Sequence, residues 1–350
     1  MKTSHEPSLL KNLIWYSRLR STAFAMQYWT LNRLSELIGF KTPIAYEEKE
    51  LLLEIRKELD QLLLADVGRI IQGVYPPSVL MPELSLHALK TLPRVVLDTF
   101  RIGKRRTQGV AKEFTESARN SFYELPEYYL RNFHFQTNGY LGEDSARVYD
   151  YEVELLFSGA ADAMRRLIIS PMKERFKDSP DGKGLKFLEI GAGTGRATKF
   201  VQLAFPKARI IALDLSDSYL KVARRNLDSF KRISFLHGDG AALPFRNEEF
   251  DAIYSVFLFH EMPLEIRTEV MKESIRVLKN KGLLGFVDSL QLEDNPQFDK
   301  FLKDFPKNFH EPFYHNYIHS SMRELFEQFQ LSQIQFGVGM LSKFGTGLKK

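Results

Sequence analysis

Short apolar runs alternate with helical patterns through the second half of the chain, from about residue 182 onward. The apolar runs are KFLEI, RIIALDL, ISFLHGD, DAIYSVF and GLLGFVD, and helical patterns such as GRATKFVQLAF and DSYLKVARRNLDSF follow several of them. Strands that alternate with helices build βαβ units, in which helices cover both faces of a parallel sheet. The chain ends in a helical pattern, SSMRELFEQF, and two glycine-containing β-runs, which predict a closing antiparallel hairpin. We therefore predict an α/β fold for residues 183–350.

The part of the chain before this alternation reads as helices. We predict a helical N-terminal region over residues 1–131 and a helical lid or linker over 132–182. Pro93 is expected to break the first region, because proline removes a backbone donor and disfavours a continuing helix. Ser145 is expected to cap a single long helix, SARVYDYEVELLFSGAADAMRRL.

Composition limits the classes of function. The chain has 350 residues, 44% of them hydrophobic, which is enough for a sizeable core. It has no cysteine, which excludes disulfides, thiolate metal sites and a cysteine nucleophile and fits a cytoplasmic protein. No apolar run is long enough to predict a transmembrane helix, and the N-terminus lacks the pattern of a secretory signal. The net charge of +5 is a mild excess, and we expect no nucleic-acid partner.

The most informative short stretch is FLEIGAGTGRAT, which joins the first expected strand to the first helix. Gly191, Gly193 and Gly195 allow a ligand to approach the backbone, and the helix N-terminus favours an anion. The spacing is G-x-G-x-G, whereas the dinucleotide fingerprint is G-x-G-x-x-G. Glu189 precedes the glycines and is poorly suited to a pyrophosphate. It suits a ligand with a cationic amine, although it could also simply pair with Lys186.

Two aspartates follow the next strands. Asp214 ends the second expected strand, where a carboxylate accepts hydrogen bonds from both ribose hydroxyls. Asp239, in HGDGAALPF, follows the third strand and is placed to accept from the exocyclic amine of adenine. The structural alternatives are that Asp214 caps the next helix and that Asp239 only stabilises a glycine-rich turn.

The segment from about 183 to 290 resembles the class I S-adenosylmethionine-dependent methyltransferases, particularly the type-11 group that includes ubiquinone and menaquinone C-methyltransferases. The matching pieces, in family order, are FLEIGAGTG, ALDLS, GDGAALPF, FDAIYSVFLFHEMP and RVLKNKGLLGFVD. The resemblance implies a Rossmann-like sheet of seven mostly parallel strands with the last one antiparallel, and S-adenosylmethionine as cofactor. The cofactor-binding residues that it implies are Glu189, Gly191, Gly193 and Gly195 around the methionine moiety, Asp214 on the ribose, Leu215, Asp239 and Gly240 at adenine, and Ser255 beside the cofactor.

His260 is the candidate catalytic residue. The sulfonium of S-adenosylmethionine is an excellent leaving group, so a methyltransferase mainly aligns an acceptor atom and excludes water. A general base is needed only where the acceptor must lose a proton. His260, in FLFHEMP just after the fourth expected strand, is placed for this role, and a structural role is the alternative. YSVF stands where amino-methylating enzymes carry D/N-P-P-F/Y/W, which argues against adenine, cytosine and glutamine-amide acceptors.

The stretch FHEPFYHNYIHS is a candidate acceptor wall. His310, His315 and His319 lie among aromatic residues, but their spacing is not a standard metal-ligand pattern, so we predict no metal site. Tyr314, His315 and Tyr317 are instead predicted to bind a hydrophobic or planar acceptor, with ordinary packing as the alternative.

Two regions before the core are expected to complete the site. The segment NFHFQTNGYLGEDSARVYDYEVELLF is a candidate cofactor lid, with Tyr140, Tyr149 and Tyr151 as its contact residues. The N-terminal helices could form a substrate cap, a dimer interface or a peripheral membrane patch over residues 11–33. The predicted acceptor is a small or lipid-like molecule, and the atom methylated and the oligomeric state stay open. A nicotinamide oxidoreductase, or a cofactor- or RNA-binding protein without turnover, are the competing hypotheses.

Overall fold

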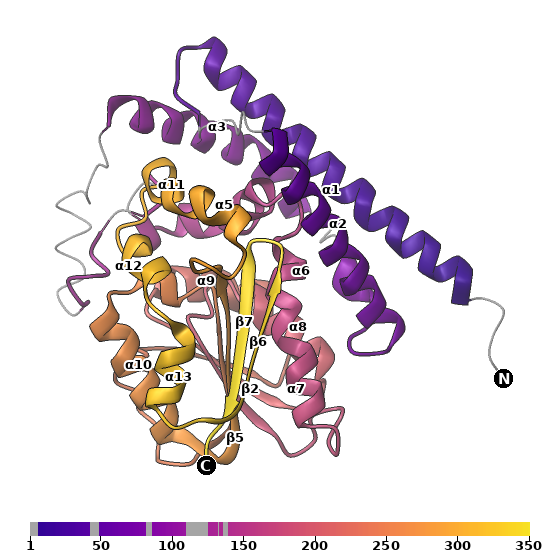
Figure 1. Ribbon diagram of the computed structural model, residues 1–350, viewed down its shortest axis with the longest axis vertical. Coiled ribbons are helices and arrows are strands. Elements are labelled where there is room, and N and C mark those ends of the chain that lie inside the picture. The colour runs from indigo at the N-terminus through magenta and orange to yellow at the C-terminus, as the bar shows by residue number, and fades with distance from the viewer. Residues whose placement is uncertain (1–5, 43–48, 82–85, 110–124, 132, 136–138) are drawn as a thin grey trace.

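The computed structural model describes residues 6–42, 49–81, 86–109, 125–131, 133–135 and 139–350, and a seven-stranded sheet lies at its centre (Figure 1). The strands are β1 (Lys186–Ile190), β2 (Arg209–Asp214), β3 (Ile233–His237), β4 (Phe250–Val256), β5 (Leu278–Ser289), β6 (Ser332–Gly339) and β7 (Ser342–Leu348). Their order across the sheet is β3-β2-β1-β4-β5-β7-β6. The predicted α/β fold with seven strands is confirmed.

One strand, β7, runs against the others. It pairs antiparallel with β5 on one side and with β6 on the other, whereas β1 to β5 pair in parallel. The hairpin predicted at the end of the chain is therefore present. The chain winds outward from β1 through β2 to β3 and then crosses to β4 on the other side of β1. Ligands in open α/β sheets bind at such a reversal, beyond the carboxyl ends of the strands.

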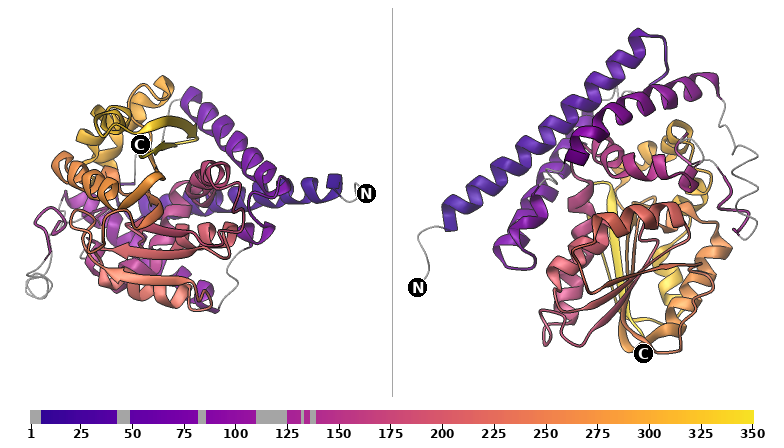
Figure 2. Two further views of the ribbon diagram at one scale, coloured as in Figure 1. Left: turned by 90° about the horizontal axis from the view of Figure 1, so that it is seen from below. Right: turned by 180° about the vertical axis from the view of Figure 1, so that it is seen from behind.

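Helices pack on both faces of the sheet (Figure 2). Those of the second half are α8 (Arg196–Ala204), α9 (Asp217–Asn226), α10 (Leu264–Val277), α11 (Asp299–Phe309), α12 (Tyr314–His319) and α13 (Met322–Gln328). Five short 3-10 turns are η1 (Pro77–Leu80), η2 (Gly139–Leu141), η3 (Arg166–Ile168), η4 (Phe259–Glu261) and η5 (Pro296–Phe298). The hydroxyl of Ser216 starts α9 by accepting from the backbone N–H of Tyr219 at 3.2 Å.

The helices of the first half lie around one end of the sheet and along its side (Figure 1). They are α1 (Glu6–Leu37), α2 (Lys49–Ile71), α3 (Leu86–Gln108), α5 (Glu143–Leu156), α6 (Ala161–Arg165) and α7 (Ile169–Arg175). In Figure 1, α1, α3 and α5 lie beyond the upper end of the sheet, and the C-terminus that follows β7 lies at the lower end. Because β7 is antiparallel, the upper end is where the parallel strands finish. We call α1, α3 and α5 the cap.

A buried ion pair ties α2 to the core. Arg166 donates from Nε and Nη2 to the two carboxylate oxygens of Asp66 at 2.9 and 2.6 Å, and both side chains are almost fully buried. Tyr75 adds a hydrogen bond to Asp66 at 2.5 Å. Val67 and Ile70 of α2 belong to the same apolar cluster as the strands. Removing one partner of such a buried pair costs about 3–5 kcal/mol, so α2 is part of the folded core.

The predicted single helix over residues 145–167 is wrong. The chain turns between α5 and α6 at Ser158 and Gly159, whose φ angles are +50° and +77°. The reason is a close approach by α1: a Cβ on Gly159 would lie 2.9 Å from Cδ2 of Phe24. Packing between distant segments, which local periodicity does not record, therefore ends α5.

Two further local predictions are wrong for similar reasons. Ser145 lies inside α5 and does not cap it, and its hydroxyl is 3.0 Å from that of Tyr219. Pro93 lies within α3 and does not break it. In the next turn Val95 is fully buried and packs in one cluster with Leu31 of α1, so tertiary packing offsets the cost of the proline.

Candidate active site

The backbone N–H groups of the glycine loop between β1 and α8 are hydrogen-bonded to the end of β2. The N–H groups of Gly191 and Ala192 both donate to the carbonyl of Leu213 at 2.9 Å, and the N–H of Gly193 donates to the carboxylate of Asp214 at 2.7 Å. Gly191 has φ +73°, and a Cβ there would lie 2.8 Å from Leu258. A phosphate site needs N–H groups directed at the ligand. These three are directed into the protein, which disfavours a pyrophosphate.

A cavity of about 990 Å³, including its open mouth, lies over the carboxyl ends of β1, β2 and β4. It brings together most of the predicted cofactor residues: Glu189, Gly191, Gly193, Asp214, Leu215, Asp239 and Gly240. We call it the cofactor cavity.

Two predicted cofactor residues do not line this cavity. Gly195 precedes α8 with φ +79°, and a Cβ there would lie 2.5 Å from Leu227, so close packing accounts for the glycine. Ser255 faces a small void that Val270 and Met271 also line, and its buried hydroxyl has no hydrogen-bond partner among the described residues. Their direct contact with the cofactor stays a prediction from the resemblance.

Glu189 is buried at the floor of the cofactor cavity. Its Oε2 accepts hydrogen bonds from Thr198 at 2.5 Å and from Tyr254 at 2.9 Å. Tyr254 can do this because the two residues are register partners on β1 and β4. Burial raises the pKa of Glu189 to about 8. A cationic group in the cavity would favour the ionised carboxylate, so the residue fits the amine of the methionine moiety.

The two aspartates are held by backbone amides. The carboxylate of Asp214 accepts from the N–H groups of Gly193 and Ser216, both at 2.7 Å, which fixes it at the end of β2. Burial raises the pKa of Asp214. Asp239 accepts from the N–H of Ala241 at 2.8 Å. Both side chains are thus held in place at the cavity wall, as ribose and adenine binding require.

An aromatic lid covers the cofactor cavity. Tyr140 and Tyr149 line it as predicted, and so do Tyr128 and Tyr129, which the sequence analysis missed. The rings of Tyr129 and Tyr140 are stacked with centroids 6.3 Å apart. Tyr151 does not line it: its ring packs on α1 and its hydroxyl donates to Gln27 at 2.5 Å.

A second cavity of about 1220 Å³ lies between the cap and the sheet. Its walls come from α1, α3, α5 and α11 and from the loop after β4, and they are mostly apolar. Tyr149, Phe257 and Glu261 line both cavities, so the two spaces meet at these residues. We call the second space the acceptor cavity.

His260 lies at the wall of the acceptor cavity and is held by Asp288 of β5. Its Nδ1 is 2.5 Å from Oδ1 of Asp288, whose Oδ2 accepts from the N–H of Phe259 at 2.7 Å. Burial by itself lowers the pKa of the imidazole, but Asp288, with Glu261 and Glu311, outweighs it and raises the pKa to about 9. With Nδ1 held by Asp288, Nε2 is the nitrogen left for the acceptor.

A second histidine stands between two acids at the junction of the cavities. His134 places Nδ1 2.8 Å from Glu311 and Nε2 3.4 Å from Glu261. Tyr140 donates to the same oxygen of Glu261. The three residues His134, Glu261 and Glu311 are close enough to hold a metal ion. Burial by itself lowers the pKa of His134, but the two acids raise it well above its usual range, and an imidazolium between them offsets part of their negative charge.

The predicted acceptor wall is only partly at the cavity. Tyr314 lines it, with its hydroxyl 2.6 Å from that of Ser289. Tyr317 is buried behind it and donates to the carbonyl of Ser289 at 2.7 Å. His315 is exposed, and its ring packs against that of His319 one turn further along α12. The helical period therefore turns His315 to solvent.

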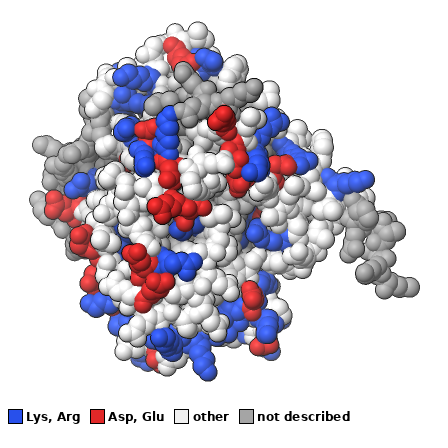
Figure 3. All heavy atoms as spheres, viewed as in Figure 1, with Lys and Arg blue, Asp and Glu red and all other residues white. Residues whose placement is uncertain are grey.

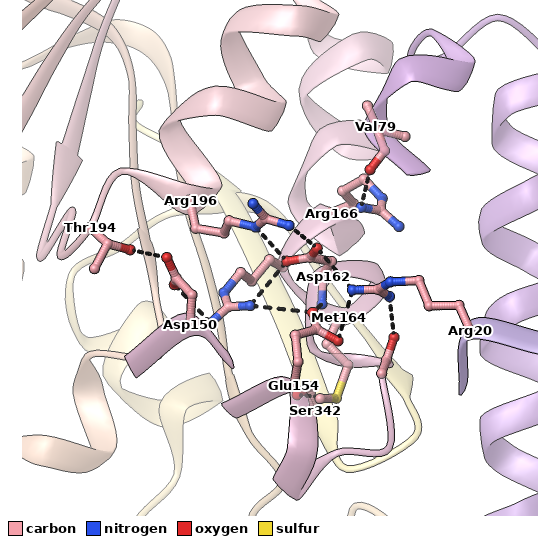
Figure 4. A network of polar contacts seen from close by, with 12 residues as sticks. Arg20, Val79, Asp150, Glu154, Asp162, Met164, Arg166, Thr194, Arg196 and Ser342 are labelled. Carbon is pink, nitrogen blue, oxygen red and sulfur yellow. Dashed lines mark hydrogen bonds and ion pairs between the residues drawn. The ribbon is translucent and has the colours of Figure 1, made fainter. Parts of the chain in front are cut away.

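The cap and the cofactor loop share one buried network (Figure 4). Asp162 of α6 accepts from Arg196, the first residue of α8, at 2.6 and 3.0 Å, and from Arg165 at 3.1 Å. Arg20 of α1 lies 3.5 Å from Asp162 and 3.2 Å from Glu154. Burial by itself raises the pKa of Asp162, but Arg196 and the other two arginines hold it well below its usual range.

The network reaches the glycine loop through α5. Asp150 accepts a hydrogen bond from the hydroxyl of Thr194 at 2.7 Å and lies 3.7 Å from Arg165. Thr194 stands between the last two glycines of the loop. The position of the loop thus depends on α5 and α6 as well as on β1.

Comparison with known proteins places the strands and loops around this site within a known domain family. A methyltransferase-domain family model matches residues 187–282. The domain belongs to the class I S-adenosylmethionine-dependent methyltransferases, type-11 group. S-adenosylmethionine is its cofactor, as the resemblance implied.

Individual relatives match only part of the molecule. A fatty-acid O-methyltransferase of Mycolicibacterium smegmatis is 28% identical over 164 residues, 47% of this chain and 52% of the relative. A demethylmenaquinone methyltransferase of Clavibacter sepedonicus is 37% identical over 99 residues, 28% of this chain and 39% of the relative. The chain thus spans about half or less of these relatives. A SAM-dependent methyltransferase structure from Aquifex aeolicus is 19% identical, with TM-score 0.38, over 51% of this chain and 89% of its own.

Among the described residues, no helix is both long and apolar enough to cross a membrane.

The raised pKa of Glu189 predicts that cofactor affinity depends on pH. Below about pH 8 the carboxyl holds a proton, which a cationic ligand must displace. We expect S-adenosylmethionine to bind more tightly as the pH rises from 6 toward 8 and to release protons on binding, measured by calorimetry in buffers of different ionisation enthalpy. Without ligand, the same shift makes the fold less stable as the pH rises from about 4.5 to 8. In this range the unfolded state loses the proton of Glu189 and the folded state keeps it.

Two variants separate Glu189 from other carboxyls. Glu189→Gln should weaken binding and lose the proton release. Glu249→Gln is the matched control, since Glu249 pairs with Lys186 outside the cavity. Proton release that is unchanged in Glu189→Gln would show that another group is titrating.

Proposed function

We propose that the protein transfers a methyl group from S-adenosylmethionine to a lipid-like acceptor. The observation that carries this proposal is the meeting of the cofactor cavity with a larger apolar cavity at Tyr149, Phe257 and Glu261. An acceptor in the second space would therefore lie next to the first, with these three side chains between them. The loop amides that point inward favour this reading over a nicotinamide oxidoreductase.

The cofactor, when bound, supplies a methyl group on a positively charged sulfur that leaves readily. The chain must then hold the acceptor, exclude water and take a proton where the acceptor has one to lose. Nε2 of His260 takes this proton, and Asp288 orients the ring and stabilises the imidazolium that forms. Oε2 of Glu261 is buried and has no hydrogen-bond partner among the described residues, so it offers a negative charge where the cavities meet.

The lipid-like nature of the acceptor follows from the walls of its cavity. Leu31, Ile102, Leu155, Phe157 and Phe305 come from the cap, the loop that follows α5, and α11, and burying apolar surface here stabilises a bound chain by roughly 25 cal/mol per Å². The relatives named above are a fatty-acid and a demethylmenaquinone methyltransferase. On the face shown in Figure 3 basic and acidic side chains are interspersed, without the basic tract that marks a nucleic-acid interface.

His260→Ala should lower turnover about 10²–10⁴-fold and leave cofactor affinity nearly unchanged. The assay is transfer of a labelled methyl group from S-adenosylmethionine to a lipid extract of the source cells. Because proton removal needs the neutral ring, wild-type turnover should rise with pH through an apparent pKa near 9, above the ordinary 6.5 of histidine. The stability that the pair adds is complete below about pH 6.5 and is lost as the pH rises through 9.

Asp288→Asn should lower that apparent pKa, since the acid that holds the proton is gone. His315→Ala is the matched control, because this histidine is exposed and should be silent. Normal turnover in His260→Ala would remove its role as base, and a protein that binds cofactor but labels no lipid would favour binding without turnover.

We also propose peripheral contact between α1 and an anionic membrane surface. Trp15, Met26 and Trp29 are each more than 60% exposed, and their spacing puts them on one side of the helix with Arg33. The protein should sediment with phosphatidylglycerol vesicles at low salt and less with phosphatidylcholine vesicles. Replacing both tryptophans by serine should abolish sedimentation. Wild-type protein that stays in the supernatant would contradict this contact.

A further inference from the structure

Among the residues that the structure describes, one arginine in the acceptor cavity has no acidic side chain beside it. Arg106 of α3 lines the cavity, and its described partners are two backbone carbonyls: Nε donates to Asn308 at 2.9 Å and Nη1 to Lys41 at 3.5 Å. Its guanidinium lies 5.7 Å from the ring centroids of both Phe135 and Phe309. Burial lowers the pKa of Arg106, which shows that its charge is incompletely compensated.

The acids on the cavity wall are engaged elsewhere. Glu261 and Glu311 contact His134, and the side chain of Glu152 bonds with that of Asp98. Among the residues that the structure describes, none of the three forms a hydrogen bond or ion pair with Arg106. Arg106 is half-buried, and a charge partly withdrawn from water without an opposite charge is costly. A guanidinium pairs best with a planar or tetrahedral oxyanion.

We propose that the acceptor is an anionic amphiphile whose carboxylate or phosphate group binds Arg106, apart from the atom that is methylated near His260. This inference rests on the proposed function, which supplies the acceptor role of the cavity. Arg106 belongs to the cap, whereas His260 belongs to the loop after β4. The same cavity is lined by apolar side chains such as Leu156 and Phe305, which suit the body of such a molecule. The cap thus selects acceptors by charge as well as by apolar surface.

Three probes of equal chain length test the charge requirement: hexadecanoate, hexadecyl phosphate and hexadecanol, each below its micelle concentration. Binding to the full chain is measured by displacement of a fluorescent apolar dye. Wild-type protein should bind at least one of the two anions on the order of 10–100-fold more tightly than the alcohol, the range of a charge-assisted hydrogen bond. The anion that binds more tightly identifies which oxyanion the site accepts.

Arg106→Gln should bind all three probes with the affinity of the alcohol. Lys104→Gln is the matched control, since it removes an exposed cation of the same helix and should keep the preference. Arg106→Lys keeps the positive charge but loses the planar guanidinium group, so it should keep part of the preference for anions. This variant tests the role of Arg106 if the glutamine variant does not fold. Equal binding of the three probes by wild type, or a preference that survives Arg106→Gln, would overturn the inference.

The labelled-methyl assay separates this result from the proposed function. Label that enters an uncharged lipid, together with equal binding of the three probes, would leave the methyltransferase standing without the anion site. A charge preference without any labelled product would support the anion site and count against the proposed methyl transfer.

Discussion

The buried carboxylate of Asp162 connects the two halves of the molecule. It receives Arg196 from the helix that follows the glycine loop and Arg165 from its own helix, and Arg20 reaches it from the cap (Figure 4). Three guanidinium groups need more negative charge than one acid supplies, and two further acids are close: Glu154 lies 3.2 Å from Arg20 and Asp150 lies 3.7 Å from Arg165. Because buried charges are stable only when paired, the cap, α6 and the cofactor loop are positioned together.

The same logic of paired charges governs the junction of the two cavities. Three acids, Glu261, Glu311 and Asp288, stand there with two histidines, His134 and His260. With both rings protonated the cluster keeps one excess negative charge. A cofactor with a positively charged sulfur would offset it, and under the proposed mechanism the proton held by His260 would become easier to remove as that charge arrives. The arrangement therefore favours chemistry when the cofactor is present.

Local patterns predicted the sheet, the hairpin and most of the cofactor cavity, because strand periodicity and the glycine loop are encoded over a few residues. Glu189 and Asp214 were correctly predicted to lie near one another, because the carboxyl ends of parallel strands meet at one edge of the sheet. Side chains placed by helix register were harder: His315 points to solvent and Tyr151 packs on α1. Asp288 raises the pKa of His260 through a contact between β5 and the loop after β4, and no local sequence pattern predicts that contact.

The central claim is that the cofactor binds over the glycine loop with its reactive end toward the acceptor cavity. A crystal structure with S-adenosylhomocysteine, the product form, tests it most directly. The account predicts the amino group at Glu189, the ribose at Asp214 and the sulfur on the side where Phe257 separates the two cavities. A nucleoside bound elsewhere, or a sulfur turned away from Phe257, would contradict it.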